Sequence, residues 1–465
     1  MGGFFGVCSK ENITDKLFYG VDYHSHLGTK YGGLAVKNSE EIKRKIHNIE
    51  EAYFRSKLEG DLEELKGNSG IGVISDTDPQ PLVFGSHLGT FGLATVGKIN
   101  NMEELINISF QKRIGFSEMS KGGTNPTSLI WQLINQGASF EEGIQNVQES
   151  VEGSCSLILL TEKGIYAARD KLGRTPVIIG KNDKGYAVTS ETCAFPNLDF
   201  EVERDLGPGE IVFLTEEGIE SKKAPGNKMQ MCSFLWVYYG FPASSYENIN
   251  VENVRYKCGA ALAKKDDVDI DFVAGIPDSG SAAGIGFSNE KGVPYKRPIV
   301  KFTPTWPRSF MPQNQEMRDL VAKMKLIPIK DLINGQRILF CEDSIVRATQ
   351  LRYHVQEFFN FGAKEIHMRP ACPPLIYGCN FLNFSRSKSE LDLAGRRAIK
   401  ELEGKDDVNL EEYILSGSEK NSAMIEIIRR DLKLTSLKYQ YLDDLVEAIG
   451  LPKEKLCTYC WDGAE

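Results

Sequence analysis

Residues Arg337–Thr349 read RILFCEDSIVRAT, a short apolar strand followed by a polar loop. The strand Arg337–Cys341 runs directly into Glu342 and Asp343, and a helix is expected to begin near Gln350. Two adjacent carboxylates can hold ribose hydroxyls or a magnesium ion, while hydroxyls and backbone N–H groups at a helix N-terminus can bind a phosphate. The pattern therefore predicts a sugar-phosphate site, and the simpler alternative is a helix N-cap with acidic residues nearby.

A second loop, Ile276–Ser281, reads IPDSGS and also closes a strand and opens a helix. Between the two loops the chain carries basic residues, among them Lys301 and Arg308. A site built from these segments would contain carboxylates, hydroxyls and cations. Such a set suits a diphosphate leaving group, because Mg²⁺ together with Arg or Lys neutralises the negative charge that develops on it.

The second half of the chain, residues 226–465, alternates strands with helices. Strands are expected at 272–276 and 337–340, and helices at 251–264 and from about 282. This alternation predicts an α/β domain with a parallel sheet, whose ligands bind where strands end and helices begin. The tail from 386 to 450 is expected to be helical.

The first half, residues 1–225, reads as short strands and turns with a few helices, which is typical of an α+β fold. Apolar residues three to four positions apart, from Ile42 to Tyr53, predict a helix over residues 39–63. The polar segment 221–228 combines charges with Pro and Gly and is the expected linker between two domains.

The 465 residues include 55 Lys and Arg against 64 Asp and Glu, a formal charge of −9. A protein that covers nucleic-acid phosphates carries the opposite balance, so no nucleic-acid partner is expected. No apolar run approaches the roughly 20 residues of a membrane helix, and no signal peptide is evident, so a soluble, cytoplasmic protein is expected. The ten cysteines are then expected to be buried thiols or metal ligands rather than disulfides.

Five segments resemble, in order and spacing, the glutamine phosphoribosyl pyrophosphate (PRPP) amidotransferase family. They are Ile276–Gly280, Arg308–Arg318, Lys325–Leu326, Glu342–Thr349 and Gly362–Arg369. The resemblance implies a pentosyltransferase of purine nucleotide biosynthesis, which displaces diphosphate from PRPP with ammonia to give 5-phosphoribosylamine. It also implies a glutaminase-like αββα sandwich of the N-terminal nucleophile type over residues 1–225. An α/β type I phosphoribosyltransferase domain would follow over residues 226–465.

The resemblance further implies roles for single residues of the second half. Magnesium and the PRPP diphosphate would be held by Ser279, Glu342 and Asp343. The 5-phosphate would be bound by Ser344, Arg347 and Thr349. A loop that closes over PRPP would carry Lys301 and Arg308.

Three positions depart from the family pattern. Glu342, Ala348 and Gln350 stand where the family commonly has Asp, Gly and Thr. Glutamate keeps the charge and alanine leaves the backbone donors of the loop available, so PRPP binding is expected to persist.

Cys457 and Cys460 form a C-x-x-C pair, a spacing that lets two thiolates bind one metal centre. From the residues alone, a zinc site, a redox pair, an iron-sulfur cluster and coincidence all remain open. The resemblance implies a [4Fe-4S] cluster with a structural role, whose other two ligands would be Cys232 and Cys379.

Gly2 stands where the family places the cysteine nucleophile of the glutaminase reaction. Leu27 and Asn125 likewise replace an arginine and an acid that the resemblance assigns to glutamine binding, and Val96 replaces an asparagine that would help form the oxyanion hole. Glutamine hydrolysis is therefore expected to be lost, with the amine supplied as free ammonia or by a separate protein. Cys8 is a nearby thiol, but the residues that follow it do not resemble the N-terminal motif of the family.

Two other functions remain open for this sequence. The departures in the PRPP loop are compatible with a non-catalytic regulator that binds PRPP or a nucleotide and pairs with an intact homologue. Transfer of a different nucleophile onto PRPP is the second alternative. The resemblance also implies a homo-oligomer.

Overall fold

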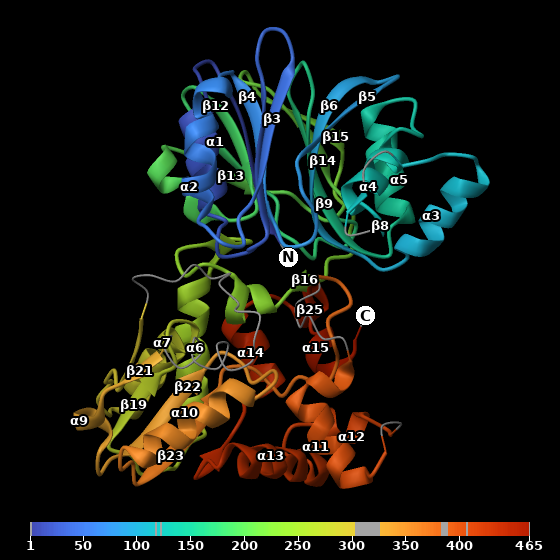
Figure 1. Ribbon diagram of the computed structural model, residues 1–465. Coiled ribbons are helices and arrows are strands. Elements are labelled where there is room, and N and C mark those ends of the chain that lie inside the picture. The colour runs from blue at the N-terminus through green and yellow to red at the C-terminus, as the bar shows by residue number, and fades with distance from the viewer. Residues whose placement is uncertain are drawn as a thin grey trace.

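The structure is a computed structural model that describes residues 2–116, 119–120, 123–302, 326–382, 389–405 and 408–464. The two halves of the chain are stacked on one another, and both chain ends lie near the junction between them (Figure 1). Arg308 and most of the basic segment around it lie outside the described residues.

The first half consists of two antiparallel sheets packed face to face between helices (Figure 1). The seven-stranded sheet has the order β13-β11-β12-β1-β4-β2-β3 and the six-stranded sheet the order β15-β14-β10-β9-β6-β5. Helix α1 packs on β1 and β4, and α4 packs on β5 and β6, which gives the αββα layers.

The strands of the seven-stranded sheet are β1 (Gly2–Ser9), β2 (Tyr31–Lys37), β3 (Ile42–Asn48), β4 (Ser69–Ser75), β11 (Ile178–Asn182), β12 (Gly185–Thr189) and β13 (Glu201–Asp205). Those of the six-stranded sheet are β5 (Leu82–Ser86), β6 (Gly89–Ile99), β9 (Gly153–Leu160), β10 (Ile165–Ala168), β14 (Ile211–Leu214) and β15 (Ile219–Lys223). The helices of this half are α1 (Thr14–Asp22), α2 (Phe54–Leu58), α3 (Met102–Gln111), α4 (Pro126–Ile134) and α5 (Phe140–Ser150). Short elements are η1 (Glu59–Glu64), β7 (Met119–Ser120), β8 (Gly123–Thr124), η2 (Thr192–Ala194) and η3 (Pro196–Leu198).

Strand β1 shows why the sandwich forms from this sequence. Phe4 lies in the apolar layer between the two sheets, whereas its neighbour Phe5 packs on the other face with Leu17 of α1. Successive side chains of a strand point to opposite faces, so a strand that is apolar at every position is buried on both sides.

The helix predicted over residues 39–63 is wrong for its first part. Residues Ile42–Asn48 form β3, a strand that pairs antiparallel with β2, and only Phe54–Leu58 is α-helical in that region. Ile42 and Ile46 are four residues apart, and this spacing satisfies a strand, with its period of two, as well as a helix. The periodicity of apolar residues could not distinguish the two.

The second half is built on a parallel sheet of order β19-β22-β23-β24, with helices around it (Figure 1). Its strands are β19 (Phe272–Gly275), β22 (Arg337–Glu342), β23 (Glu365–Pro370) and β24 (Ser436–Leu437). Its helices are α6 (Val251–Lys264), α7 (Ser279–Lys291), α9 (Lys330–Ile333), α10 (Thr349–Asn360), α11 (Ala394–Glu403), α12 (Glu411–Ile414), α13 (Glu419–Leu432), α14 (Leu442–Ile449) and α15 (Tyr459–Asp462). The predicted strands, the helix at 251–264 and the helical tail are confirmed.

Short elements complete the second half. They are β16 (Met231–Cys232), η4 (Leu235–Tyr239), β17 (Ser245–Tyr246), β18 (Ile249–Asn250), β20 (Ile299–Lys301), β21 (Leu326–Pro328), η5 (Glu390–Asp392), η6 (Lys453–Lys455) and β25 (Leu456–Cys457). Strands β16 and β25 pair in parallel, so the C-terminal segment returns to the junction between the halves.

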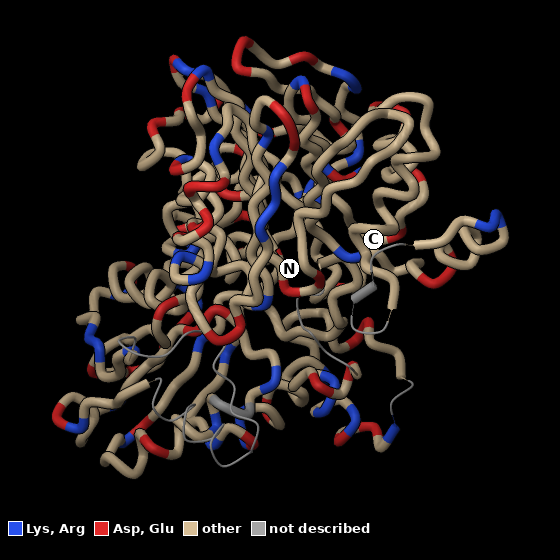
Figure 2. Tube along the Cα trace, turned by 45° about the horizontal axis from the view of Figure 1, so that its top comes forward, with Lys and Arg blue, Asp and Glu red and all other residues tan. Residues whose placement is uncertain are grey.

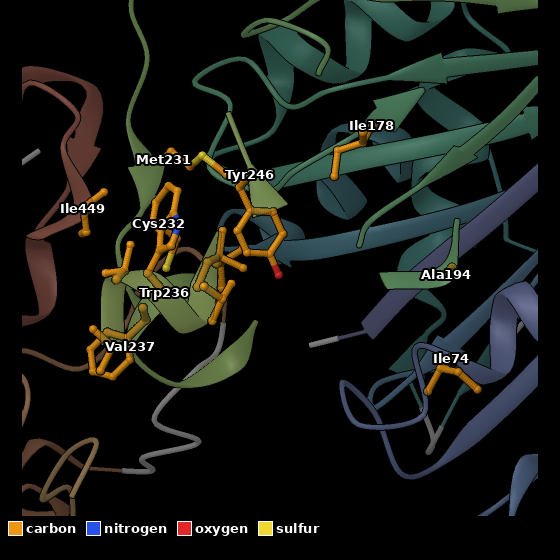
Figure 3. Packing of buried hydrophobic residues seen from close by; sticks show 14 of the residues in the cluster. Ile74, Ile178, Ala194, Met231, Cys232, Trp236, Val237, Tyr246 and Ile449 are labelled. Carbon is orange, nitrogen blue, oxygen red and sulfur yellow. The ribbon is translucent and has the colours of Figure 1, made fainter. Parts of the chain in front are cut away.

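A single apolar cluster crosses that junction. It includes Ile178 and Ala194 of the first half and Trp236, Tyr246 and Ile449 of the second (Figure 3). The rings of Trp236 and Tyr246 meet edge to face with centroids 5.7 Å apart. Because the same apolar layer serves both halves, their relative position is fixed by packing.

Within the described part of the chain, no helix is both long and apolar enough to span a membrane. Acidic and basic residues are scattered over the trace of both halves (Figure 2).

Candidate functional site

The two predicted loops meet at the carboxyl edge of the parallel sheet. Strands β19 and β22 are parallel neighbours, so the loops that follow them emerge side by side. Ser279 Oγ donates a hydrogen bond of 2.5 Å to one Asp343 carboxylate oxygen, and Ser344 Oγ donates one of 2.5 Å to the other. A Cβ on Gly280 would lie 2.4 Å from the Cys341 carbonyl oxygen, so glycine is required for this close approach.

Glu342 and Asp343 form a closely coupled acidic pair. The backbone N–H of Asp343 donates to Glu342 Oε1 at 3.1 Å. Burial, and then the charge of Asp343, raise the pKa of Glu342 well above its ordinary value. A divalent cation would remove that repulsion, and oxygen donors of this kind are the ligands that Mg²⁺ prefers.

The second loop leads into helix α10, whose N-terminus is the predicted phosphate-binding end. Its N-cap, Ala348, has a φ of 64°, in the left-handed region that favours glycine. Arg347 is exposed, its guanidinium lies 3.7 Å from Asp392, and its carbonyl oxygen accepts a hydrogen bond from Arg397. Thr349 begins α10, but its side chain lies outside the described residues, as does Arg308.

Lys301 ends β20 next to the first loop. Its ammonium lies 2.6 Å from a carboxylate oxygen of Asp278, and both side chains are well exposed. The structure thus brings Lys301, Ser279 and Asp343 to one edge of the sheet, as the sequence predicted.

A cavity of about 720 Å³ separates this edge from the first half. The first half contributes His26–Thr29 and Asp76 to its wall. The second half contributes Tyr238–Pro242, Arg255, Pro277–Ser279 and Lys301. Loops of the glutaminase-like half therefore face the first predicted PRPP loop, Pro277–Ser279, across this cavity.

Arg255 is a site residue that the sequence reasoning missed. It donates to the carbonyl oxygens of Trp236, Tyr238 and Gly240 at 3.0, 3.1 and 2.9 Å. Burial lowers the pKa of Arg255, while the nearby charge of Asp343 acts in the opposite direction. A signal was present, because this arginine interrupts the apolar face that Val251, Val254, Cys258 and Leu262 form along α6.

A smaller pocket of about 190 Å³ lies at the N-terminus of β1. Gly2, Val96 and Gly97 line it. A Cβ on Gly2 would lie 2.3 Å from the Ile74 carbonyl oxygen, so the backbone here is packed for a residue without a side chain. Asn125 caps α4, its side chain accepting from the backbone of Thr127 and Ser128.

Two thiols, Cys8 and Cys155, lie in surroundings that disfavour a thiolate. Cys8 is buried between the sheets, where its thiol donates to the Leu214 carbonyl oxygen at 3.6 Å, and burial raises its pKa. Cys155 lines the small pocket, but burial, and then the charges of Asp170 and Asp78, raise its pKa to about 12. A thiol that stays protonated is a poor nucleophile.

The four predicted cluster cysteines converge from three parts of the chain. Cys232 and Cys457 lie opposite one another in the β16–β25 pair, and they line one small cavity with Cys379 and Cys460. The pKa of Cys232 is raised by burial and then by the neighbouring Cys457 and Cys379. The pKa of Cys460 is raised by its contact with Cys379 and then by burial. Over the described ranges, no group of three or more His, Cys, Asp or Glu side chains is arranged to hold a single metal ion.

Two groups beside these thiols can interact with sulfur. The Leu382 N–H points at Cys379 Sγ at 3.4 Å. The Arg174 guanidinium lies 3.4 Å from the ring centroid of Phe381. Burial raises the pKa of Cys457, and the positive charge of Arg174 partly offsets that rise. Hydrogen bonds and charges near sulfur tune an iron-sulfur centre where one is bound.

The chain is similar to known proteins over its whole length. A family model described as "Glutamine amidotransferase domain" matches residues 69–197. The amidophosphoribosyltransferase of Methanothermobacter thermautotrophicus is 30% identical over 478 residues, covering 99% of this chain and 93% of that protein. The enzyme of the same name from Methanocaldococcus jannaschii is 29% identical over 491 residues, covering 100% of this chain and 97% of that protein.

The fold is also that of a solved relative. The glutamine PRPP amidotransferase of B. subtilis, solved with ADP and GMP, superposes with a TM-score of 0.83 at 25% identity, covering 100% of this chain and 97% of that chain. The predicted combination of a glutaminase-like sandwich with a phosphoribosyltransferase domain is confirmed. With its full length matched by relatives of one kind, the chain belongs to the amidophosphoribosyltransferase family of glycosyltransferases.

Proposed function

We propose that this chain is an amidophosphoribosyltransferase of purine nucleotide biosynthesis that uses ammonia and no longer hydrolyses glutamine. It would displace diphosphate from PRPP and release 5-phosphoribosylamine. The observation that carries the transferase part of the proposal is the contact of Ser279 with Asp343 at the edge of the cavity. The loss of glutamine hydrolysis is supported by the close packing of Gly2 on Ile74.

In the transferase half, Ser279, Glu342 and Asp343 would hold Mg²⁺ together with the diphosphate of PRPP. The ion, when bound, would neutralise the charge that develops on the leaving diphosphate. Ser344, Arg347 and Thr349 would bind the 5-phosphate at the N-terminus of α10, where the helix dipole favours an anion. Lys301 and Arg308 would add positive charge beside the diphosphate.

The amine would reach PRPP as ammonia through the cavity between the halves. Leu27 makes part of the wall on the glutaminase-like side, and its apolar side chain is compatible with passage of a neutral molecule. The source would be free ammonia or a separate ammonia-supplying protein.

A [4Fe-4S] cluster on Cys232, Cys379, Cys457 and Cys460 forms part of the proposal. Its support is the convergence of four buried thiols with Arg174 and the Leu382 N–H. The cluster would join the start of the second half to the C-terminal segment and play no part in transfer. The division into domains at residues 225 and 226, a homo-oligomeric state and a cytoplasmic location also stay predictions.

The decisive experiment mixes purified protein with PRPP, Mg²⁺ and either ammonium or glutamine. Diphosphate release with ammonium and none above background with glutamine is the expected result. Equal rates with the two donors would refute the loss of glutaminase activity, and no release with either would refute the transferase assignment.

A second candidate is a non-catalytic PRPP-binding regulator. Ala348, held at a positive φ in the phosphate loop, is the observation that favours it. Calorimetry that detects PRPP binding in a protein without turnover would support this candidate, and ammonia-dependent turnover would eliminate it.

A further inference from the structure

Glu191 of the glutaminase-like half is buried at the junction, where it follows β12. The described residues place five donor groups around its carboxylate, from both halves of the chain. From the first half, His26 Nε2 lies 3.1 Å from Oε1 and the Cys193 thiol donates to Oε2 at 3.5 Å. Burial alone would raise the pKa of Glu191, but the charges of His26 and His24 and the hydrogen bonds of His26 and Tyr246 bring it below its ordinary value.

The other three donors belong to the second half. The Tyr246 hydroxyl donates to Oε1 at 2.9 Å and the Ser244 hydroxyl to Oε2 at 3.1 Å. The Phe241 backbone N–H lies 3.4 and 3.3 Å from the two oxygens. One buried carboxylate thus holds the turn 241–246 against the glutaminase-like half.

That turn continues directly into a wall of the 720 Å³ cavity. The wall segment, Tyr238–Pro242, is held from the other side by Arg255, which donates to the carbonyl oxygens of Tyr238 and Gly240. Arg255 lines the same cavity as Ser279, and the charge of Asp343 acts on it. Contacts therefore run from Glu191 through the wall segment to Arg255, which lines the cavity together with Ser279 of the first predicted PRPP loop.

We propose that Glu191 is a positioning residue of the transferase, through which the glutaminase-like half sets the cavity wall Tyr238–Pro242 and Arg255 beside the PRPP loops. The inference rests on the proposed PRPP site and gives the first half a role that needs no nucleophile. The Glu191 carboxylate satisfies several buried donors, and a buried donor that loses its acceptor is costly. The turn should therefore rearrange when the charge is removed.

The test compares Glu191→Gln with Glu210→Gln in the full-length protein. Glu210 is a matched control, because it is also buried in the first half and paired, with Arg204 at 2.7 Å, but does not line the cavity. Glu191→Gln is expected to raise the KM and Kd for PRPP about tenfold with kcat changed less than about threefold. Glu210→Gln is expected to leave the KM for PRPP within about twofold of the wild-type value. This should hold even if it lowers the melting temperature as much as Glu191→Gln does.

A milder pair of variants keeps the test valid if Glu191→Gln does not fold. Tyr246→Phe and Ser244→Ala each remove one donor and are expected to raise the Kd for PRPP, measured by calorimetry, by about threefold. In the Glu191→Gln background, Tyr246→Phe should add little, because the two residues act through one contact.

The outcomes separate the two proposals. Wild-type protein that binds PRPP without turnover contradicts the proposed function, and the Kd values of the variants still decide the role of Glu191. Normal wild-type turnover with an unaltered Kd in Glu191→Gln and Tyr246→Phe overturns the inference alone. Wild-type protein that binds no PRPP contradicts both.

Discussion

Ser279 Oγ lies 2.5 Å from Asp343 Oδ1, although 64 residues separate the two in the chain. The contact exists because β19 and β22 are parallel neighbours whose carboxyl ends share one edge of the sheet. The close approach also needs Gly280, since any side chain there would meet the carbonyl of Cys341. The predictions below follow from this edge and from its surroundings.

Asp343→Asn is expected to lower ammonia-dependent diphosphate release by about 100-fold or more, because the carboxylate both binds Ser279 and would hold Mg²⁺. The melting temperature should change little, since a loop residue contributes little to core packing. Asp331→Asn, on the exposed surface of α9, is the control and should retain wild-type activity. Wild-type activity in Asp343→Asn would contradict the site.

Ala348→Gly is expected to stabilise the protein by about 1 kcal/mol, because glycine adopts the positive φ of this N-cap without strain. Urea denaturation of the two proteins measures the difference. Ala261→Gly, in the middle of α6, is the matched control and should destabilise by about 1 kcal/mol. Effects of the same sign at both sites would show that the backbone at Ala348 is not strained.

Gly2→Cys is not expected to restore glutamine hydrolysis, because a Cβ there would lie 2.3 Å from the Ile74 carbonyl oxygen. The forced shift should lower the free energy of unfolding by about 1–3 kcal/mol. Gly85→Cys, where a Cβ would have no neighbour within 4 Å, should have a much smaller effect. The measurements are denaturant unfolding and glutamate release, and glutamate release by Gly2→Cys would contradict the prediction.

His24 makes the protein sensitive to acid. Its ring is buried, with Nδ1 2.8 Å from the Gly20 carbonyl oxygen, and burial lowers its pKa to about 4. In the unfolded chain the His24 ring takes up a proton at its ordinary pKa of 6.5. The contribution of neutral His24 to the free energy of unfolding is therefore fully present above that pH. It is lost as the pH falls towards 4, by at most about 3 kcal/mol.

Chemical denaturation between pH 7 and pH 4 measures this loss in wild type and in His24→Asn. The variant should lose less stability over the range, whereas His47→Asn, on the partly exposed strand β3, should follow the wild type. Parallel curves for all three proteins would show that His24 is not the group responsible.

Cys460→Ser is expected to abolish the broad visible absorption and the bound iron of anaerobically purified protein, because it removes one of four proposed ligands. Cys258→Ser is the control, since that buried thiol lies in α6, away from the cavity that the four cysteines share. Elemental analysis that finds zinc and no iron in the wild type would contradict the cluster.

The strands at 272–276 and 337–340 and the helices at 251–264 and from about 282 followed from local pattern, because each is short, regular and bounded by polar loops. The helix α6 was predicted over its full length, whereas Ile42–Asn48 was assigned to a helix and is a strand. A spacing of four fits both periods, and only pairing with β2 decides between them. Strand pairing joins residues distant in the chain, and no local pattern records it.

The candidate site was predicted in part for the same reason. Ser279, Lys301 and Asp343 belong to segments whose composition is informative, so the sequence could predict that they would lie at one site. Arg255 and Glu191 were not predicted, since each acts on backbone or side chains that lie near it only after folding.

The sequence by itself determined the chemistry that this protein has available: the acids and hydroxyls of Glu342–Ser344, the four cysteines, and a glycine at position 2. Residue types carry that information, because donors, charges and nucleophiles are properties of single side chains. The tertiary structure alone decided which of these groups meet. It placed Ser279 on Asp343, closed Gly2 against Ile74 and gathered donors from both halves around Glu191, because sheet order and burial bring distant segments together.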